Sequence, residues 1–115
     1  MSLEDGKRAE QKASSHLQAL GYTILTCNFH SKFGEIDIIA RDRDYLVFIE
    51  VKYRRDEHEG DPAEAVDARK QARILRTARY YMTRYHISED TPCRFDVVAV
   101  LGSNVRLIRD AFWCG

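Results

Sequence analysis

The 115-residue sequence lacks several features that define special protein classes. No apolar run reaches the roughly 20 residues that span a membrane, and the segment from Met1 to Gln11 is too charged for a signal peptide. The three cysteines, Cys27, Cys93 and Cys114, lie far apart without a CxxC pair, which favours reduced thiols over a disulfide framework or a zinc site. We therefore expect a cytoplasmic protein with no membrane association.

The sequence also has no excess of charge of one sign, because 18 lysines and arginines match 18 aspartates and glutamates. An interaction with nucleic acid must therefore depend on where the charges lie and not on net charge. We find no internal repeat, low-complexity tract or linker. The content of 44% apolar and 31% charged residues fits one globular domain, residues 1–115, with a buried core.

The stretch from residue 34 to residue 52 carries the most informative pattern in the sequence. Two apolar runs, separated by a short charged segment, alternate with the period of about 2 that is typical of strands. This alternation predicts that Ile36 and Ile38 share one face of the first strand, whereas Glu35 and Asp37 share the other. The acidic side chains are therefore expected to be grouped.

The charged segment predicts a β-hairpin, whose register sets which residues face each other. With a two-residue loop at Arg43–Asp44, positions whose numbers sum to 87 are paired, so Asp37 lies opposite Glu50 and Glu35 faces Lys52. A three-residue loop would make the relation between Asp37 and Glu50 diagonal instead of direct. In both registers the two carboxylates are neighbours.

Two opposed carboxylates repel, so a purely structural ladder has little reason to keep them without a cation between them. Proteins commonly hold Mg²⁺ or Mn²⁺ with carboxylates, waters and a substrate phosphate. We expect Asp37 and Glu50 as ligands, Glu35 as an accessory acid, and Lys52 as the group that positions a water or stabilises charge on a phosphodiester. The alternative is a solvated strand face with a Glu35–Lys52 ion pair and an arginine beside Asp37.

The spacing of these residues resembles a known nuclease motif. Glu-Ile-Asp, twelve residues and then Glu-Val-Lys is similar to the PD-(D/E)XK motif, although Ile36 stands where the wider superfamily often has proline. Nearly the whole chain resembles a family of small, largely uncharacterised bacterial proteins that are distantly similar to archaeal Holliday junction resolvases. The residues that carry this resemblance are Glu10, Gly21–Tyr22, Asn28, Gly34–Asp37, Glu50–Lys52, Arg69–Lys70 and Arg94–Asp96.

The resemblance implies a restriction-endonuclease-like core and an activity. It implies that Asp37 and Glu50 bind the metal, that Lys52 is catalytic and that Glu10 is an accessory acid. The expected function is Mg²⁺- or Mn²⁺-dependent endonuclease hydrolysis of DNA, with branched or junction DNA as one substrate class. A nucleic-acid-binding protein that hydrolyses poorly and a structural interaction domain stay as alternatives, because a family resemblance implies a fold more firmly than an activity.

Helical periodicity predicts two helices. The first runs from about Leu3 to Leu20 with Gly21 as a C-cap, and Glu10 lies at the edge of its apolar stripe. The second begins near Asp61–Pro62 and ends near Tyr85. Its predicted core face consists of Ala68, Ala72, Leu75, Ala78, Met82 and Tyr85.

Further apolar runs predict strands at 22–27, 94–101 and 105–108. The segment 28–33 between the first two strands is expected to be a loop, whose phenylalanines either join the core, which we favour, or stack on bases. The resulting order αβββαββ predicts an α/β fold with a mixed β-sheet flanked by helices. A right-handed helical crossover would make the third and fourth strands parallel.

Two features near the C-terminus have alternative interpretations. Asp96 is either a further metal ligand or the ion-pair partner of an arginine such as Arg94, and we favour the ion pair. The apolar tail, residues 110–115, either docks on the domain or forms an oligomer contact, which would give a homodimer.

Basic residues near the expected site are candidates for phosphate contacts. The second helix carries six basic residues between Arg69 and Arg84 and no acid, which favours phosphate contact and a solvated face equally. On the same helix, Lys70 borders the site, and Gln71 either reaches the edge of the site or caps a buried backbone group. The candidates for contact with nucleic acid, DNA in the first place, are Lys32, Arg54, Arg55, Arg69, Arg73 and Arg76.

Overall fold

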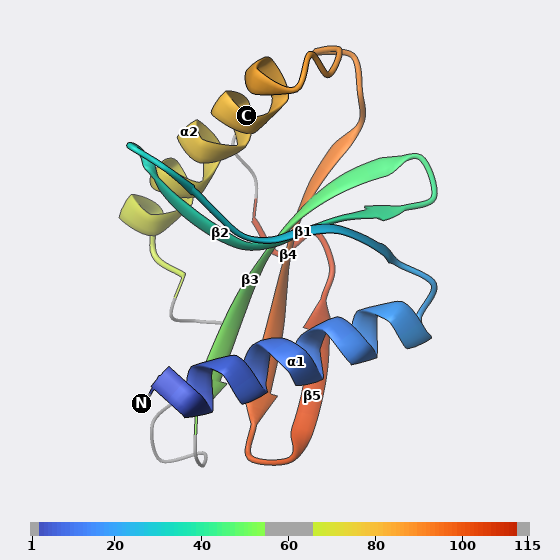
Figure 1. The fold of residues 1–115 in the computed structure, drawn as a ribbon, viewed down its shortest axis with the longest axis vertical. Coiled ribbons are helices and arrows are strands. Elements are labelled where there is room, and N and C mark those ends of the chain that lie inside the picture. The colour runs from blue at the N-terminus through green and yellow to red at the C-terminus, as the bar shows by residue number, and fades with distance from the viewer. Residues whose placement is uncertain (1–2, 55–65, 113–115) are drawn as a thin grey trace.

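The computed structural model describes residues 3–54 and 66–112 and arranges them as a five-stranded sheet with two helices (Figure 1). The predicted order αβββαββ and the mixed sheet flanked by helices are confirmed. No helix among these residues is long and apolar enough to cross a membrane. In chain order the elements are α1 (Leu3–Ala19), β1 (Thr23–Ser31), β2 (Gly34–Asp42), β3 (Tyr45–Arg54), α2 (Ala68–Arg84), β4 (Cys93–Leu101) and β5 (Asn104–Ile108).

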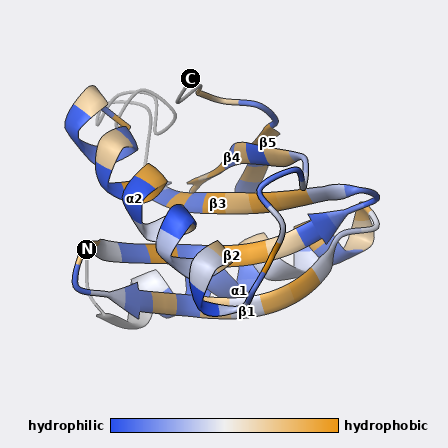
Figure 2. Cartoon of the chain, turned by 90° about the horizontal axis from the view of Figure 1, so that it is seen from above, coloured by the Kyte–Doolittle hydropathy of each residue, from blue (hydrophilic) through white to orange (hydrophobic). Residues whose placement is uncertain are grey.

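The sheet has the strand order β1-β2-β3-β4-β5. β3 and β4 are parallel, as predicted for strands joined through a helix, and the other neighbouring pairs are antiparallel. Segments 46–49 of β3 and 97–100 of β4 are buried, and Figure 2 shows the apolar residues of β3 in the middle of the sheet. The strand that carries Glu50 and Lys52 is therefore anchored on both sides by its neighbours.

The two helices pack on opposite faces of the sheet. Ala9, Ala13 and Leu17 of α1 belong to one core cluster, together with alternate residues of the central strands such as Val47 and Ile49. The other cluster lies under α2 and contains Ile39, Leu46, Phe48, Val97, Ile74, Ala78 and Tyr81. Burial of these apolar side chains on both faces is the main contribution to the stability of such a domain.

Helix α1 matches its prediction closely. Ala9, Ala13 and Leu17 of the predicted stripe are buried, whereas Leu20 at the end of the stripe is 46% exposed. Gly21 adopts φ 96° and its N–H donates to the Gln18 carbonyl, while the N–H of the next residue donates to the Leu17 carbonyl. This is the pattern of a glycine-terminated helix, in which the left-handed residue satisfies the last carbonyls.

Helix α2 differs from its prediction in start and in rotation. It begins at Ala68, where the Asp67 carboxylate accepts the Lys70 N–H at 2.9 Å as an N-cap. The predicted start at residues 61–62 lies outside the described residues, but residues 66–67 are not helical. Apolar residues surround much of this helix, so periodicity alone did not set which side meets the sheet. The buried face is Ile74, Thr77, Ala78 and Tyr81, whereas Ala68, Ala72 and Tyr85 of the predicted face are exposed.

Strand β1 is longer than predicted and includes most of the segment that we expected to be a loop. It continues to Ser31 because Phe29 pairs with Ile36 and His30 pairs with Glu35 in the ladder with β2. Phe29 also packs edge-on against Tyr81 of α2, with ring centroids 5.1 Å apart. The turn to β2 is therefore short and consists of residues 32–33.

Candidate functional site

The β2–β3 hairpin has the predicted register over its regular part. Ile38 pairs with Ile49, and the ladder continues to Asp42 and Tyr45, so that every pair sums to 87 and the loop is Arg43–Asp44. Arg43 takes φ 57°, the left-handed conformation that such a tight loop requires even though no glycine is present. The paired region ends at Ile38 and Ile49, so Asp37 and Glu50 lie just beyond it.

Asp37 marks the point where β2 leaves β3. Its Oδ2 accepts the backbone N–H of Val51 at 2.7 Å, so the carboxylate takes the place of a strand carbonyl. The alternation of faces also breaks here, because Ile36 packs in the cluster under α2 whereas Ile38 packs in the cluster under α1. The prediction that Ile36 and Ile38 share one face is therefore wrong, since β2 loses its β3 neighbour at Asp37, while it stays paired with β1, and does not keep one regular pleat there.

The charge environment of Asp37 shows that it lies close to Glu50. Burial and then the negative charge of Glu50 raise the pKa of the Asp37 carboxyl from 3.8 to about 7, although the bond from Val51 opposes the rise. Glu10 and Glu35 raise it further through their charges. Asp37 and Glu50 are thus neighbours that repel each other, as the hairpin predicted.

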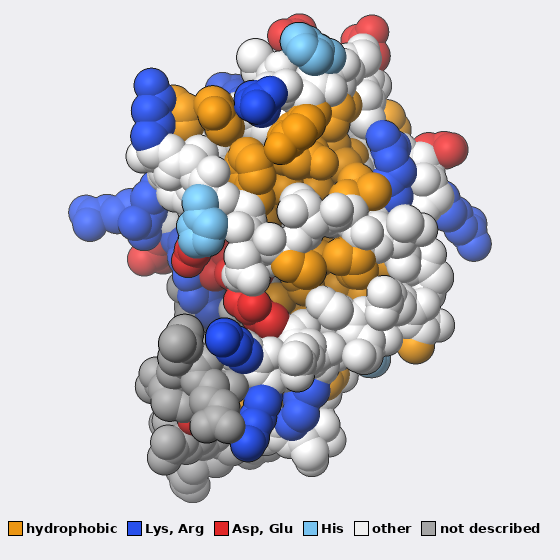
Figure 3. All heavy atoms as spheres, viewed as in Figure 1, with side chains coloured by type: hydrophobic (Ala, Val, Ile, Leu, Met, Phe, Trp, Pro, Cys, Tyr) orange, Lys and Arg blue, Asp and Glu red, His pale blue; other side chains and the backbone are white. Residues whose placement is uncertain are grey.

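Glu50 is held by two lysines. Its side chain is only 8% exposed, and its Oε1 lies 2.6 Å from Lys70 Nζ and 3.3 Å from Lys52 Nζ. Lys70 comes from the first turn of α2, so the crossover helix contributes directly to the site. These contacts place Lys52, Lys70 and the two carboxylates in one cluster at the end of the paired hairpin; Figure 3 shows acidic and basic side chains side by side on this face.

The two lysines have opposite pKa shifts. Burial, and then the hydrogen bond with Lys70, lower the pKa of Lys52, and its contacts with Glu50 oppose this only in part. Burial also lowers the pKa of Lys70, but its hydrogen bonds to Glu50 and Lys52 outweigh that effect and raise it. Lys52 is therefore the lysine that more readily gives up its proton, whereas Lys70 stays charged beside Glu50.

The two other acids are placed at the edge of this cluster. Glu35 does not face Lys52, because the β2–β3 ladder ends at Ile38 and Ile49; its Oε2 lies 3.2 Å from Nδ1 of His30, its exposed partner on β1. Glu10 of α1 accepts a hydrogen bond at 3.1 Å from the amide of Asn28, a β1 residue with φ 54°. The direct pairing of Glu35 with Lys52 is wrong, whereas Glu10 does turn towards the sheet.

Gln71 and Asp96 have structural partners. The Gln71 amide donates to the Val66 carbonyl at 3.0 Å, which is the second of its two predicted roles. Asp96 is fully buried and accepts hydrogen bonds from Arg94 Nε at 2.9 Å, the Tyr22 hydroxyl at 2.8 Å and the backbone N–H of residue 110 at 3.0 Å. The ion-pair interpretation of Asp96 is confirmed, so it is not a candidate ligand.

The candidate phosphate contacts are distributed around the site. Lys32 Nζ lies 5.2 Å from the Phe33 ring centroid in the β1–β2 turn, and Arg54 bonds its own neighbour, the carbonyl of residue 53, at 2.9 Å. Arg55 lies outside the described residues. The structure therefore keeps the α2 arginines available to a partner but does not assemble all candidates in one patch. The exposed candidates on α2 are Arg69, Arg73 and Arg76.

The tail docks in part on the domain. Phe112 is 9% exposed and stacks on Phe95 with ring centroids 5.1 Å apart, while residues 113–115 lie outside the described part of the chain. The described cysteines, Cys27 and Cys93, form no disulfide.

The two carboxylates of this site are suited to a hard divalent cation, but they do not form a complete set of ligands. Asp37 and Glu50 are two mostly buried carboxylates whose repulsion a cation would relieve, and one or two carboxylates completed by water and phosphate suffice for Mg²⁺. Among residues 3–54 and 66–112, however, no three His, Cys, Asp or Glu side chains are grouped as metal ligands. Any bound cation would therefore depend on water or substrate oxygens for its remaining ligands.

Comparison with known proteins identifies relatives over nearly the whole chain. The model of the uncharacterised protein family UPF0102 matches residues 9–100. A UPF0102 protein of Lachnoclostridium phytofermentans is 48% identical over 108 residues, which are 94% of this chain and 92% of the relative. Similar proteins of Nitrosococcus oceani and Syntrophus aciditrophicus are 42% and 45% identical; the matches cover 95% and 96% of this chain and 91% and 90% of theirs. None of these names states an activity.

Proposed function

The chain belongs to the uncharacterised protein family UPF0102, and because that name assigns no activity, we propose from the site itself that the protein is a metal-dependent endonuclease that hydrolyses DNA phosphodiester bonds. Branched or junction DNA is the substrate class that we propose first, and the cytoplasm is the proposed location. The observation that carries this proposal is the pairing of two repelling, mostly buried carboxylates, Asp37 and Glu50, with a lysine of lowered pKa, Lys52.

A structural role explains this cluster poorly. Burying a carboxylate next to another carboxylate costs free energy, and the raised pKa of Asp37 is a direct expression of that cost. Both lysine ion pairs go to Glu50, and Asp37 is reached only by the weaker charge attraction of Lys70, which offsets the cost in part. Groups whose environment opposes their ordinary ionisation are typical of sites kept for chemistry.

The side chains suggest how hydrolysis would be divided among them. Asp37 and Glu50 would hold Mg²⁺ or Mn²⁺, which when bound lowers the pKa of a coordinated water and polarises a phosphoryl oxygen. Lys52 Nζ would hold or move the proton of the attacking water, a task for which its lowered pKa is suited. Lys70 would keep Glu50 in position through its 2.6 Å contact, and Glu10 would add negative charge at the edge.

The experiment is cleavage of labelled four-way junction and duplex DNA by the full chain with Mg²⁺ or Mn²⁺. We expect junction cleavage that falls by about 100-fold or more in Lys52→Ala, because general acid–base assistance contributes factors of this size. Lys12→Ala is the matched control, since Lys12 is an exposed lysine on α1 whose Nζ contacts the Gly102 carbonyl at 3.4 Å, away from the carboxylates. Cleavage that survives in Lys52→Ala would show that the activity does not come from this site.

A second candidate function has one observation in its favour. Lys70 and Lys52 both contact Glu50. Their positive charges therefore already neutralise part of the negative charge that a bound cation would otherwise neutralise. A nucleic-acid-binding protein that keeps this site without hydrolysis is therefore the alternative. Salt-dependent binding of the junction in EDTA, combined with no cleavage in either metal, would favour the alternative over the nuclease.

A further inference from the structure

An aromatic cluster lies outside the carboxylate–lysine site, where the β1–β2 turn meets α2. The Tyr80 ring lies 6.1 Å from the Phe33 ring in the turn and 6.1 Å from the Phe29 ring in β1. Tyr80 is 38% exposed, so its contacts with Phe29 and Phe33 do not bury the whole ring. The cluster therefore presents part of an aromatic surface to solvent.

The turn that carries Phe33 is seated directly on α2. Gly34, which follows Phe33, adopts φ 144°, and a Cβ at that position would lie 3.5 Å from Thr77 Oγ1 and 3.9 Å from Arg73 Cβ. The start of β2 therefore lies directly beside the helix, one turn before Tyr80. Phe33 and Tyr80 thus belong to a preformed surface and not to two independent segments.

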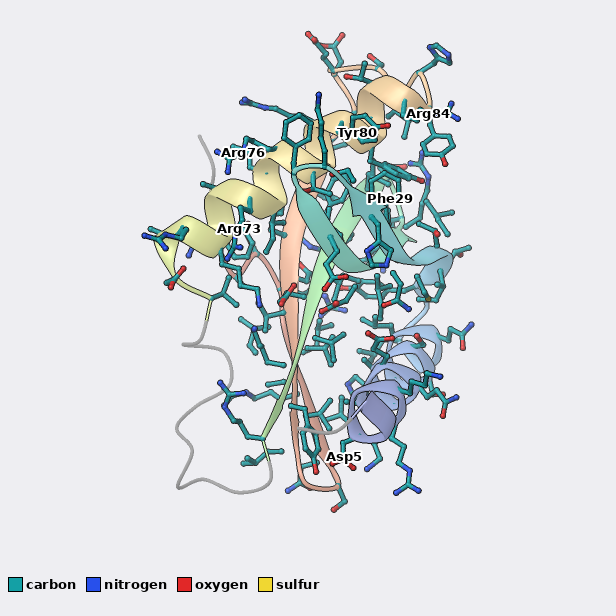
Figure 4. All side chains as sticks on the ribbon, turned by 60° about the vertical axis from the view of Figure 1, so that its left-hand side comes forward. Asp5, Phe29, Arg73, Arg76, Tyr80 and Arg84 are labelled. Atoms are coloured by element: carbon teal, nitrogen blue, oxygen red, sulfur yellow. The ribbon has the colours of Figure 1, made fainter. Side chains whose placement is uncertain are left out.

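Tyr80 lies within a stripe of arginines. At 100° per residue, Arg73, Arg76, Tyr80 and Arg84 fall within an arc of about 80° on α2, and Figure 4 shows them in succession along the helix with Phe29 across from Tyr80. The helix Ala68–Arg84 contains no acidic residue, and within the described chain Arg73 and Arg76 form no ion pair. A stacking surface flanked by positive charge is the combination that single-stranded nucleic acids bind.

We propose that Phe33 and Tyr80 form a stacking platform for an unpaired base of DNA, with Arg73, Arg76 and Arg84 as contacts for the flanking phosphates. The proposal rests on the proposed function and deepens it, because it defines the substrate as DNA with an unpaired segment near the cleaved bond. A base in an intact duplex already stacks on its neighbours on both sides, so an aromatic ring gains a base face only where pairing and stacking are interrupted.

The platform and the carboxylate–lysine site lie on the same helix at a definite spacing. Lys70, which contacts Glu50, and Tyr80 are ten residues apart on α2, so the two sites are about 15 Å apart along the helix axis. At about 3.4 Å per stacked nucleotide, this corresponds to roughly four nucleotides. The unpaired base is thus expected about four nucleotides from the bond that the site would cleave.

The test measures binding of the full chain to fluorescent (dT)₁₂ and to a duplex of the same length in EDTA, so that cleavage plays no part. Tyr80→Ala should weaken (dT)₁₂ binding by about 5- to 150-fold and leave duplex binding within about twofold. Tyr80→Phe should bind like the wild type, because it keeps the ring. Tyr80→Leu should lose affinity like Tyr80→Ala, which separates stacking from apolar packing of the turn.

Two further measurements show whether the loss of affinity in Tyr80→Ala comes from lost stacking and not from lost charge or a disturbed fold. Tyr80→Ala should leave the salt dependence of (dT)₁₂ binding unchanged, whereas Arg76→Gln should lower its slope by about 0.7 unit. Tyr45→Ala is the control, since Tyr45 is a 42% exposed tyrosine at the start of β3 and outside α2, and it should leave (dT)₁₂ affinity unchanged.

The outcomes distinguish this proposal from the proposed nuclease function. Equal losses for single strand and duplex, wild-type affinity in Tyr80→Leu, or tighter binding of (rU)₁₂ than of (dT)₁₂ would overturn the platform for unpaired DNA, whether or not the protein cleaves junctions. Tyr80-dependent single-strand binding without metal-dependent cleavage would support the platform and count against the nuclease alone.

Discussion

Two clusters of charge lie at opposite ends of the β2–β3 ladder, and they are balanced differently. At the hairpin end, Arg94 Nη2 donates to Asp42 at 2.8 Å and Arg94 Nε donates to Asp96 at 2.9 Å, so one guanidinium joins two carboxylates. At the other end, Asp37 and Glu50 also form a pair of carboxylates, but both neighbouring lysines contact Glu50. Similar groups are thus closed into a network in one place, whereas in the other the repulsion that Asp37 experiences is offset only in part, by Lys70 and the Val51 N–H.

The pKa shifts express this difference. The hydrogen bond with Asp96, helped by Asp42, raises the pKa of Arg94, and burial with donation to Asp96 raises the pKa of Tyr22 to about 12. Both groups are held in the protonation state that they have at neutral pH. The Asp37 carboxyl, whose pKa is raised to about 7, is instead held between two states at that pH. The first cluster therefore favours the folded state, whereas the second has the raised carboxyl pKa on which the proposed function rests.

The largest change in stability is expected from removing Arg94 from its cluster with Asp42 and Asp96, the balanced cluster. Arg94→Met would leave the fully buried Asp96 and its neighbour Asp42 without their shared cation, which should lower the free energy of unfolding by about 3 to 5 kcal/mol. Urea unfolding at neutral pH measures this. Arg109→Met is the control, because Arg109 is 52% exposed and its Nε lies 3.9 Å from Asp42, so a loss of only about 0 to 1 kcal/mol is expected. Equal losses in the two variants would contradict the assignment of Arg94 as the central cation.

Removing the charge of Asp37 from its cluster with Glu50, Lys52 and Lys70 should change stability in the opposite direction. In EDTA at pH 8, Asp37→Asn should be more stable than the wild type by on the order of 1 to 3 kcal/mol, because the amide oxygen can still accept the Val51 N–H while the repulsion disappears. Urea unfolding of the two proteins, side by side, measures the difference. A clearly destabilised Asp37→Asn would show that the carboxylate is there to hold the strands and would remove the metal-site interpretation.

The pH dependence of this difference has a defined sign. The folded pKa of Asp37, about 7, is raised above its ordinary value of 3.8, so between these values the folded state holds a proton that the unfolded chain has lost. The wild type therefore loses stability as pH rises through this window, and the loss is complete above the folded pKa. We expect the advantage of Asp37→Asn to be small near pH 4 and to grow up to about pH 8. An advantage that does not change with pH would exclude ionisation of Asp37 as its cause.

A cation should balance the second cluster as Arg94 balances the first. Mn²⁺ or Mg²⁺ at about ten times its Kd should stabilise the wild type by about 1.4 kcal/mol and raise its Tm, since a ligand of the folded state stabilises it by mass action. Glu50→Gln should show a much smaller shift in the same thermal melts. Na⁺ at matched ionic strength controls for screening, and equal shifts in both proteins would exclude Glu50 as a ligand.

The smallest effect concerns the arginines on α2. Replacing Arg73 and Arg76 by Gln should weaken duplex binding similarly for different sequences and lower the salt slope by up to about 0.9 unit for each phosphate that is no longer neutralised. Binding titrations between low and physiological salt give the slope. The double variant is compared with Arg109→Gln, an exposed arginine beside the balanced cluster, and an unchanged slope would show that the α2 arginines are only solvated.

The sequence by itself determined the features that depend on near neighbours in the chain. The hairpin and the end of α1 at Gly21 followed from signals that act over a few residues. The choice between a two-residue and a three-residue loop stayed open, and the structure has the two-residue loop. The neighbourhood of Asp37 and Glu50 was predictable for the same reason.

Only the tertiary structure decided the features that depend on contacts between distant segments. The rotation of α2 depends on which of its apolar residues fit the sheet, and that packing brings Lys70 to Glu50 and Tyr80 to Phe33. Beyond Asp37, β2 stays paired with β1 but no longer with β3, and here the Asp37 carboxylate bonds the backbone of β3 in place of a ladder pair. Periodicity within one segment carries no information on the surface that another segment presents to it, so these contacts appear only when the chain is folded.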